Sequence, residues 1–177
     1  MKNTIINTER LILRRWSPND LDALIAMNAD PEVMTHFVKV MTAEESTSMH
    51  ERFLQHWEKY GFGPYAVEIP GETTCAGFVG VFIPRFETWF TPCAEFAWRL
   101  ATKFHGKGYA TEAAKAILPV SFTQHHYDKI YAFSVPANKS SQRVMEKLGM
   151  EQIGDFDHPN VPEGHELKRH LLYAISK

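Results

Sequence analysis

The chain has few cysteines and no long apolar run, and each shortage excludes a class of protein. Cys75 and Cys93 are the only two cysteines among 177 residues, too few and too separated for a disulfide framework or a cysteine-based metal site. We expect both to be reduced and structural. No apolar run approaches the roughly 20 residues that cross a bilayer, and the first seven residues lack the apolar core of a signal peptide. We therefore expect a cytoplasmic protein without a membrane partner.

The chain is also short of net charge and of histidine pairs at metal-binding spacing. Its formal charge is −2, which argues against binding nucleic acid through the bulk field of the protein. Among the nine histidines only His125 and His126 are adjacent, and neighbouring side chains point apart on a regular element. We expect no metal site. Because internal repeats and linkers are absent, we expect residues 1–177 to form a single domain.

The most informative feature present is a turn with two glycines that leads into a helix. Gly106 and Gly108 permit a close backbone approach, so consecutive N–H groups can converge on an anion. A strand-like alternation over residues 94–100 precedes the turn, and an apolar stripe at helical spacing follows it over residues 109–118. The helix would add unpaired donors and the positive end of its dipole. The pattern predicts a phosphate-binding loop, and an ordinary turn between two elements is the alternative.

Two common phosphate-binding patterns do not match this turn. A nucleoside triphosphate loop requires Gly-Lys followed by Ser or Thr, and a dinucleotide fold requires a third glycine where Thr111 stands. The local charge nevertheless suits a small polyanion, because residues 99–115 contain four Lys or Arg and one acid, Glu112. A solvated helix face would give the same charge pattern.

The segment Lys103-x-x-Gly106-x-Gly108 resembles the pyrophosphate loop of the GNAT superfamily of acetyl-coenzyme A dependent N-acetyltransferases. Lys103 stands where the family usually has Gln or Arg, which keeps a long donor but loses the planar fork. The resemblance covers nearly the whole chain, in the family's order, and is to the branch of ribosomal-protein N-terminal acetyltransferases of the RimJ and RimL type. The other matching segments are residues 8–14, 19–21, 77–80, 95–98, 138–141 and 148–150.

The fold class that follows is α/β or α+β, because strands and helices alternate along the chain. The resemblance implies a GNAT-like fold, with a mixed, mostly antiparallel central sheet of about six or seven strands and helices on both faces. The pattern predicts strands at 11–16, 65–69, 74–83, 94–100, 129–135 and 167–175, and helices after Ser17 or Asn19 and at 43–59, 109–118 and 140–148. Pro119 predicts a kink or an early end of the third helix.

The resemblance also implies roles for particular residues. Glu95 would take the proton of the attacking amine, directly or through water, and Ser141 would lie near the thioester sulfur as an acid or a hydrogen-bond donor. The alternatives are a solvent-facing Glu95 and simple helix capping by Asn138 and Ser141. The cofactor contacts implied are Trp98, Arg99 and Leu100 on the strand, Lys103, Phe104, His105, Gly106, Lys107, Gly108, Tyr109 and Ala110 around the loop, and Asn138, Ser141 and Arg143 on the following helix.

The function implied is transfer of an acetyl group from acetyl-coenzyme A to a primary amine by direct attack in a ternary complex. The acceptor would be the N-terminal α-amine of a peptide or protein, or a small amine, and the enzyme a monomer or a homodimer. A non-catalytic acetyl-coenzyme A sensor is the alternative. The aromatic segments 34–37, 60–65 and 86–90 either line the acceptor entrance or belong to the core.

Overall fold

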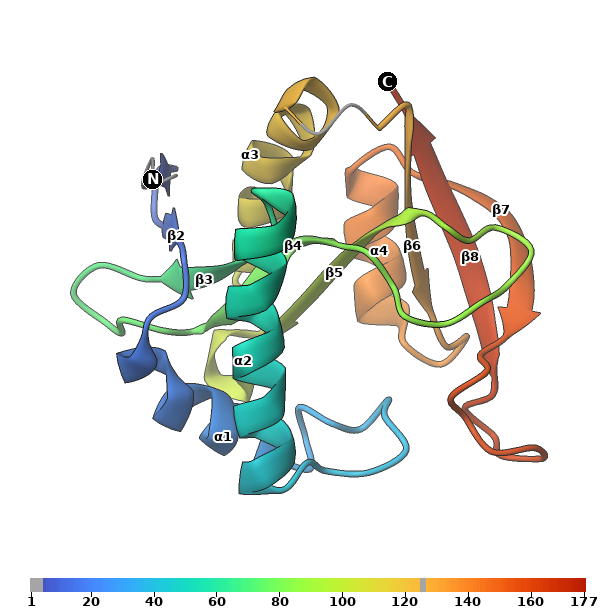
Figure 1. The fold of residues 1–177 in the computed structure, drawn as a ribbon, viewed down its shortest axis with the longest axis horizontal. Coiled ribbons are helices and arrows are strands. Elements are labelled where there is room, and N and C mark those ends of the chain that lie inside the picture. Colours follow the sequence, from blue (N-terminus) through green and yellow to red (C-terminus); the bar gives the residue numbers. More distant parts are fainter. Residues whose placement is uncertain (1–4, 125–126) are drawn as a thin grey trace.

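The computed structural model describes residues 5–124 and 127–177, so the predictions about residues 1–4 and about His125 and His126 lie outside the described residues. Figure 1 shows the arrangement of the elements. The strands are β1 (Ile6–Asn7), β2 (Ile12–Arg14), β3 (Pro64–Glu68), β4 (Gly77–Phe82), β5 (Ala94–Leu100), β6 (Lys129–Ser134), β7 (Glu151–Asp157) and β8 (Arg169–Ser176); the helices are α1 (Leu21–Ala29), α2 (Ala43–Tyr60), α3 (Tyr109–Gln124) and α4 (Lys139–Lys147), with 3-10 turns η1 (Pro18–Asp20) and η2 (Thr102–Phe104).

One mixed sheet joins all eight strands in the order β1-β2-β3-β4-β5-β6-β8-β7. Neighbouring strands are antiparallel, except that β5 and β6 are parallel. The predicted α/β fold with a mostly antiparallel sheet and helices on both faces is confirmed, with eight strands instead of about six or seven.

The two strands that the pattern did not predict are β1 and β7. β1 is two residues long, too short for an alternation to be read, and β7 is interrupted by a register shift between Gln152 and Gly154. Pro119 lies inside α3, which continues to Gln124, so the predicted early end of this helix is wrong. In this part of the helix the Ser121 hydroxyl donates to the carbonyl of Ile117, and the Thr123 hydroxyl donates to the carbonyl of Pro119. Side chains therefore supply some of the polar contacts here.

Two helices cover each face of the sheet, because successive side chains of a strand point to opposite faces. Leu24 and Met27 of α1 and Phe53 of α2 pack against Phe78 of β4. On the other face, a cluster of α3 and α4 residues packs against Val79 and Val81 of the same strand; it includes Ala113, Ala114, Ile117 and Met145. The side chains of β5 therefore face α1 and α2 at Glu95, Ala97 and Arg99, which pair with Phe82, Gly80 and Phe78.

Local signals explain where the N-terminal helices begin. Ser17 precedes η1, and its N–H and its hydroxyl both donate to the Asp20 carboxylate, at 2.7 and 3.0 Å. Thr42 caps α2, and its Oγ1 accepts from the Glu45 N–H at 3.2 Å. Gly61, with φ of 74°, ends α2 in the left-handed conformation that favours glycine.

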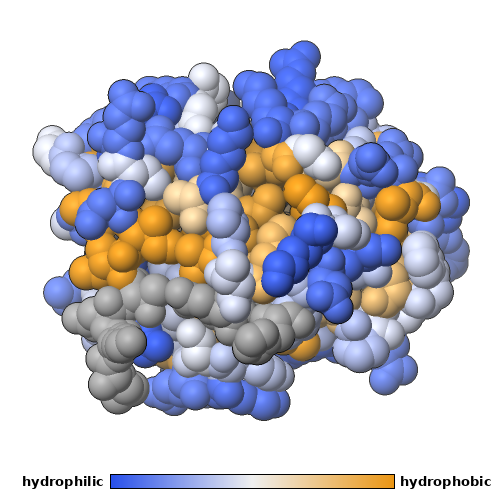
Figure 2. All heavy atoms as spheres, turned by 90° about the horizontal axis from the view of Figure 1, so that it is seen from above, coloured by the Kyte–Doolittle hydropathy of each residue, from blue (hydrophilic) through white to orange (hydrophobic). Residues whose placement is uncertain are grey.

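The molecular surface is mixed in polarity. Seen from above, it carries a band of hydrophobic residues between hydrophilic margins (Figure 2). Within the described residues, no helix combines the length and the apolar character needed to cross a membrane. Cys75 and Cys93 are both buried and free of disulfides, which agrees with the structural role expected for them.

Candidate active site

The glycine turn lies where the sequence pattern placed it, between the end of β5 and the start of α3. Gly106 and Gly108 have φ values of 73° and 82°, in the left-handed region that glycine adopts without strain. A Cβ added at Gly106 would meet no atom within 4 Å, so the space in front of this residue is open. The two glycines and Lys107 are exposed, and the first turn of α3 adds its unpaired N–H groups at the same place.

Not every amide of the predicted loop is available for an anion. The N–H groups of Phe104 and His105 donate to the carbonyls of Ala101 and Thr102, both at 2.9 Å. The Phe104 side chain is 1% exposed and supports the ammonium groups of Lys103 and Lys107, which lie 4.7 and 5.6 Å from its ring centre. The amides left for a diphosphate are those of Gly106 to Ala110.

His105 has a local structural contact. Its Nε2 lies 2.8 Å from the carbonyl oxygen of Leu100, so this ring nitrogen donates a hydrogen bond to the end of β5. Thr102 donates from its hydroxyl to Asp30 at 2.9 Å. These contacts tie the 3-10 turn to the end of β5 and to the end of α1.

A second chain segment, which the sequence analysis did not connect with the loop, holds it from the other side. Glu112 Oε1 accepts from the Thr8 hydroxyl at 2.6 Å and from the Arg10 N–H at 2.9 Å, and Oε2 accepts from Arg10 Nε at 2.7 Å. Arg10 Nη1 also donates to the Lys107 carbonyl at 3.0 Å. Thr8 and Arg10 are about a hundred positions from Glu112 in the chain, so no local pattern could have indicated these contacts. The one signal in the sequence was that residues 8–14 and the glycine loop both match motifs of the same family.

β5 and β6 separate immediately after their first residues. Their parallel register contains only Ala94 with Ile130 and Glu95 with Tyr131. From Phe96 onward the two strands are no longer paired, and this opening leads toward the glycine loop at the end of β5. The backbone of Trp98 to Leu100 therefore has no strand partner on its β6 side within the register that the structure shows.

Glu95 lies at the start of this opening, on the face that α1 and α2 cover. Burial raises the pKa of its carboxyl to about 7. Burial disfavours the charged form because water no longer solvates it. The nearby Cys93 thiol has its pKa raised to about 12 by burial and by the charge of Glu95, so it is not a nucleophile at neutral pH.

Asn138 and Ser141 lie at the start of α4, on the α3 side of the sheet. Asn138 caps this helix, since its Oδ1 accepts from the Ser141 N–H at 3.1 Å and from the Ser140 hydroxyl at 2.8 Å. The structure therefore shows the capping interaction of Asn138 directly. Ser141 is partly exposed and Arg143 is exposed on the same helix. Glu95 and Ser141 therefore belong to opposite sides of the sheet, Glu95 to the α1 and α2 side and Ser141 to the α3 and α4 side.

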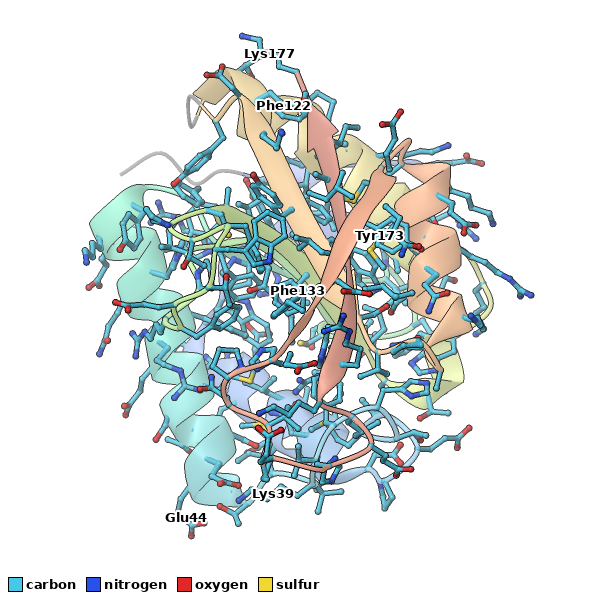
Figure 3. All side chains as sticks on the ribbon, turned by 90° about the vertical axis from the view of Figure 1, so that its right-hand side faces the viewer. Lys39, Glu44, Phe122, Phe133, Tyr173 and Lys177 are labelled. Atoms are coloured by element: carbon cyan, nitrogen blue, oxygen red, sulfur yellow. The ribbon has the colours of Figure 1, made fainter. Side chains whose placement is uncertain are left out.

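A cluster of aromatic side chains includes Phe90, which contacts Tyr131, the residue paired with Glu95 across β5 and β6. The rings of this cluster contact one another, with distances between ring centroids from 4.9 to 6.5 Å. Its members include Phe90, Phe133, Phe156, His158 and His170. Figure 3 shows Phe133 and Tyr173 from neighbouring strands. Phe133 packs into this cluster and Tyr173 into the core on the α4 side, because the residues paired across β6 and β8 alternate between faces.

The predicted aromatic segments are divided between core and surface. Phe62, Tyr65, Phe90 and Met34 are buried in the core. Phe37 is 43% exposed and Trp89 67% exposed. The core alternative therefore holds for the four buried residues, and the lining of the acceptor entrance stays a prediction for the exposed ones.

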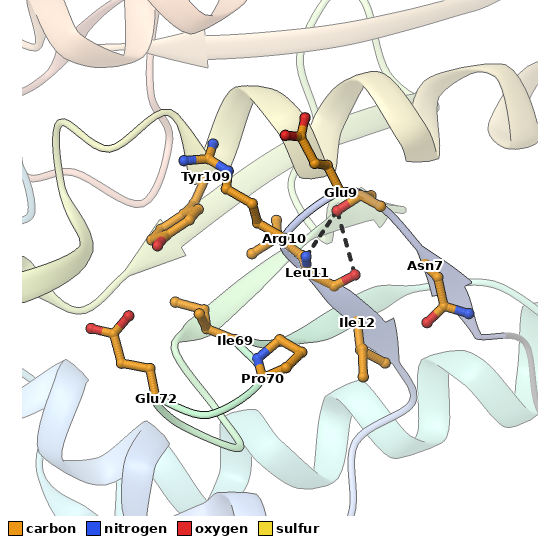
Figure 4. A pocket seen from close by; sticks show the side chains of 10 residues that line it. Asn7, Glu9, Arg10, Leu11, Ile12, Ile69, Pro70, Glu72 and Tyr109 are labelled. Carbon is orange, nitrogen blue, oxygen red and sulfur yellow. Dashed lines mark hydrogen bonds between the residues drawn. The ribbon is translucent and has the colours of Figure 1, made fainter.

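A cavity of about 410 Å³ lies beside Tyr109, the first residue of α3 (Figure 4). Glu95 is not among the residues that line it. Arg10, Glu72 and Tyr109 line it, and the Arg10 guanidinium lies 4.6 Å from the centre of the Tyr109 ring. Of the predicted site residues it includes Tyr109 alone. Among the described residues no cluster of three or more His, Cys, Asp or Glu is placed to hold a metal ion.

The loop fits the diphosphate of coenzyme A on three observations of this structure. The glycines have positive φ, the space before Gly106 is open, and Lys103 and Lys107 flank the turn. The opening between β5 and β6 continues from the loop toward Glu95. A linear molecule with a phosphate end and a reactive end would follow this path.

Comparisons with known proteins agree with this geometry. The acetyltransferase (GNAT) domain model matches residues 10–151. YnaD of Bacillus subtilis (strain 168), named as an uncharacterized N-acetyltransferase, is 30% identical over 170 residues, covering 96% of this chain and 95% of the relative. An Aspergillus fumigatus FsC-acetyl coenzyme A-N(2)-transacetylase is 25% identical, covering 97% of this chain and 76% of the relative.

Solved structures extend the likeness to the fold. A GNAT-family acetyltransferase from Bacillus anthracis is 29% identical and superposes with a TM-score of 0.77, covering 98% of each chain. The match of the family model to most of this chain, together with these relatives, shows the reaction class. The chain belongs to the GNAT family of acetyltransferases and is an acetyl-coenzyme A dependent acyltransferase.

Proposed function

We propose that the protein transfers the acetyl group of acetyl-coenzyme A to a primary amine by direct attack in a ternary complex, with Glu95 as the base. The observation that carries this proposal is the raised pKa of Glu95, about 7, at the start of the opening between β5 and β6. A carboxyl group with a pKa near the working pH accepts a proton effectively while still being partly ionised. Glu95 acts on the amine directly or through one water.

Residues of the glycine loop, of β5 and of α4 serve the cosubstrate. The free amides of Gly106 to Ala110 bind the diphosphate, with the helix N-terminus of α3 behind them. Trp98, Arg99 and Leu100 contribute backbone groups to the pantetheine arm. Asn138 orients the first turn of α4, and the Ser141 hydroxyl hydrogen-bonds the leaving sulfur. A thiol of pKa about 8.5 leaves readily, so full proton delivery is not required.

The acceptor we propose is an α-amine, of a peptide or protein N-terminus or of a small molecule. Roughly a fifth of an α-amine is neutral at pH 7, whereas a lysine amine is neutral in less than about one part in a thousand. A base as weak as Glu95 suits the first. The motifs favour the RimJ and RimL branch; a ribosomal-protein-S5-alanine acetyltransferase from Vibrio fischeri shares the fold, with 16% identity, a TM-score of 0.74 and coverage of 98% and 97%.

We further propose that residues 1–177 work as one domain, because a single sheet runs through all eight strands. We propose a cytoplasmic location and a monomer or homodimer as the active form. The two buried free thiols suit a reducing compartment.

The proposed function is tested by thiol release. The protein is incubated with acetyl-coenzyme A and a panel of amines that includes N-terminal peptides and small amines, and free thiol is measured against a control without acceptor. We expect acceptor-dependent release by the wild type and a strong reduction by Glu95→Gln. Thermal stabilisation by acetyl-coenzyme A without acceptor-dependent release would contradict the proposal and favour a binding module.

A further inference from the structure

Arg99 is a cation on the same strand and the same face as the proposed base. Glu95 and Arg99 are four residues apart on β5, which places their Cα atoms about 13 Å apart along the strand. Ala97, between them, carries only a methyl group, and Gly80 is its partner on β4. The cause of the raised Glu95 pKa is burial alone, so Arg99 does not neutralise this carboxyl.

The contacts of Arg99 are all neutral. Nη1 donates to Asn28 Oδ1 at 2.6 Å and lies 3.8 Å from the sulfur of Met41. The guanidinium lies over the Phe37 ring, 4.2 Å from its centre, and 5.6 Å from the centre of Phe78. Nε is sealed from solvent and has no hydrogen-bond partner among the described residues. None of the ion pairs among the described residues includes Arg99.

Arg14 shows how the same fold treats an arginine with a structural task. Its guanidinium donates to both oxygens of Asp20 at 2.8 Å and to Glu68 at 2.9 Å. The pKa of Arg14 is raised by these carboxylates, whereas burial lowers the pKa of Arg99 to about 10. A desolvated cation is costly unless a counter-charge accompanies it. Arg99 therefore lacks the partner that Arg14 has.

The surface beside Arg99 is open and apolar. Phe37, Val38 and Val40, in the segment between α1 and α2, are 43%, 45% and 43% exposed. Phe37 covers one side of the guanidinium while remaining exposed itself. A ligand that reaches Glu95 along this face of β5 would meet Arg99 and this apolar segment together.

We infer that Arg99 binds a carboxylate of the acceptor, so that the enzyme selects amines that also carry an acidic group. This inference rests on the proposed function and names the substrate class of the same site. A guanidinium offers a planar fork that matches a carboxylate and holds it in one orientation. The base at Glu95 and the cation at Arg99 would thus fix an acceptor at its amine and at its acidic group.

Pairs of acceptors that differ only in a carboxylate or a carboxamide measure the effect of the acidic group alone. Peptide amides with Asp at position 1, 2 or 3 are compared with the same peptides carrying Asn, and ω-amino acids of increasing length with their carboxamides, using rates corrected for the ionisation of each amine. For the wild type we expect kcat/KM to favour the acidic member by at least about tenfold at one spacing, through a lower KM.

Variants of Arg99 then test whether this residue is responsible. In Arg99→Gln the ratio of kcat/KM for the acidic acceptor to kcat/KM for its neutral counterpart should fall toward one, with the neutral acceptor as the baseline for each variant; Arg99→Lys should keep part of the preference. Arg169→Gln, which removes an exposed arginine paired with Asp155 and Asp157, is the matched control and should change nothing. If Arg99→Gln folds poorly, the ratio of kcat/KM for the acidic and neutral acceptors is compared between the wild type and Arg99→Lys, and an unchanged ratio would still contradict the inference.

The experiments distinguish a failure of this inference from a failure of the proposed acetyl transfer. Calorimetry with the coenzyme A complex and the N-acetylated Asp or Asn peptide gives a readout that needs no turnover, and the Asp product should bind more tightly only when Arg99 is present. Turnover without any acid preference, or a preference unchanged in Arg99→Gln, would overturn the inference alone. Absence of acceptor-dependent release in both series would instead count against the proposed acetyl transfer.

Discussion

Arg10 and Glu112 join the N-terminal segment to the first turn of α3, with Arg10 Nε donating to Glu112 Oε2 at 2.7 Å. Because Arg10 Nη1 also donates to the carbonyl of Lys107, this pair holds the glycine loop from behind. The contact explains why the segment around Arg10 matters to a phosphate site with which it shares no local sequence. Arg10 is a positioning residue, since it acts through the loop backbone.

Arg10→Gln should therefore weaken acetyl-coenzyme A binding without removing a contact to the acceptor. We expect KM for acetyl-coenzyme A to rise about three- to tenfold while kcat stays nearly unchanged, because an exposed charged contact contributes modestly. Steady-state kinetics at varied acetyl-coenzyme A measure the split. Arg169→Gln is the control, and an equal loss in both variants would show that the effect is a general one.

Gly108→Val should weaken cofactor binding strongly. The φ of 82° at this position strains a β-branched residue, and a new side chain would also approach Arg10 Nη2, which lies 3.5 Å from the Cβ position. We expect affinity for acetyl-coenzyme A to fall by about tenfold or more, measured by calorimetry. Gly164→Val, with φ of 75° in open space, carries the same backbone strain away from the site and should bind normally.

Glu95→Gln should lower turnover and remove a pH dependence. In the wild type the rate should rise as pH passes about 7, because the carboxylate becomes available as the base. The variant should bind acetyl-coenzyme A normally. Its rate should no longer rise around pH 7 through this carboxyl, so that only the titration of the acceptor amine shapes the pH–rate profile. Identical pH–rate profiles for both proteins would exclude Glu95 as the base.

The same substitution should stabilise the protein at high pH. The folded-state pKa of about 7 lies above the usual value of 4.5, so the unfolded chain loses its proton first as pH rises. The free energy of unfolding of the wild type should fall by about 2 kcal/mol between pH 5 and pH 8 through this group, and Glu95→Gln should not show that fall. Denaturant unfolding at the two pH values measures it.

Ser141→Ala should slow the reaction without abolishing it. The hydroxyl only stabilises a thiolate that leaves without much help, so we expect a loss of about tenfold in kcat. Ser140→Ala is the control in the same turn, where the hydroxyl donates to Asn138 Oδ1 at 2.8 Å. A larger effect in Ser140→Ala would show that helix capping, and not the sulfur contact, matters here.

His158 should make the protein sensitive to acid. Burial, with the nearby His170 and Lys168, lowers its pKa to about 4 from 6.5, so the unfolded chain takes up the proton first as pH falls. The contribution of His158 to the free energy of unfolding is fully present above pH 6.5 and should be smaller by about 2 kcal/mol at pH 5. His158→Phe keeps the ring contact with Phe86, 4.7 Å between centroids, and should lose less stability between pH 7.5 and pH 5. Unfolding curves that shift equally with pH would contradict this assignment.

Local signals predicted most of the elements around the site. β5 was predicted with the bounds that the structure has, and α2 and α4 within one residue, because alternation, capping residues and glycine stops are written in adjacent positions. β1 and β7 carry no such signal, since their pairing depends on strands that lie elsewhere in the chain. Of the two outcomes expected at Pro119, the early end is wrong because α3 continues to Gln124, and the kink stays a prediction.

The amino-acid sequence by itself determined the glycine loop, the strand before it, the helix after it and the family resemblance, because these depend on residues close together in the chain. Only the tertiary structure decided that Arg10 supports that loop, that β5 and β6 part after Glu95, and that Arg99 has no carboxylate partner within residues 5–124 and 127–177. The physical reason is that burial and charge pairing arise between distant segments. A carboxyl or a guanidinium acquires its chemistry from the surroundings that folding brings to it.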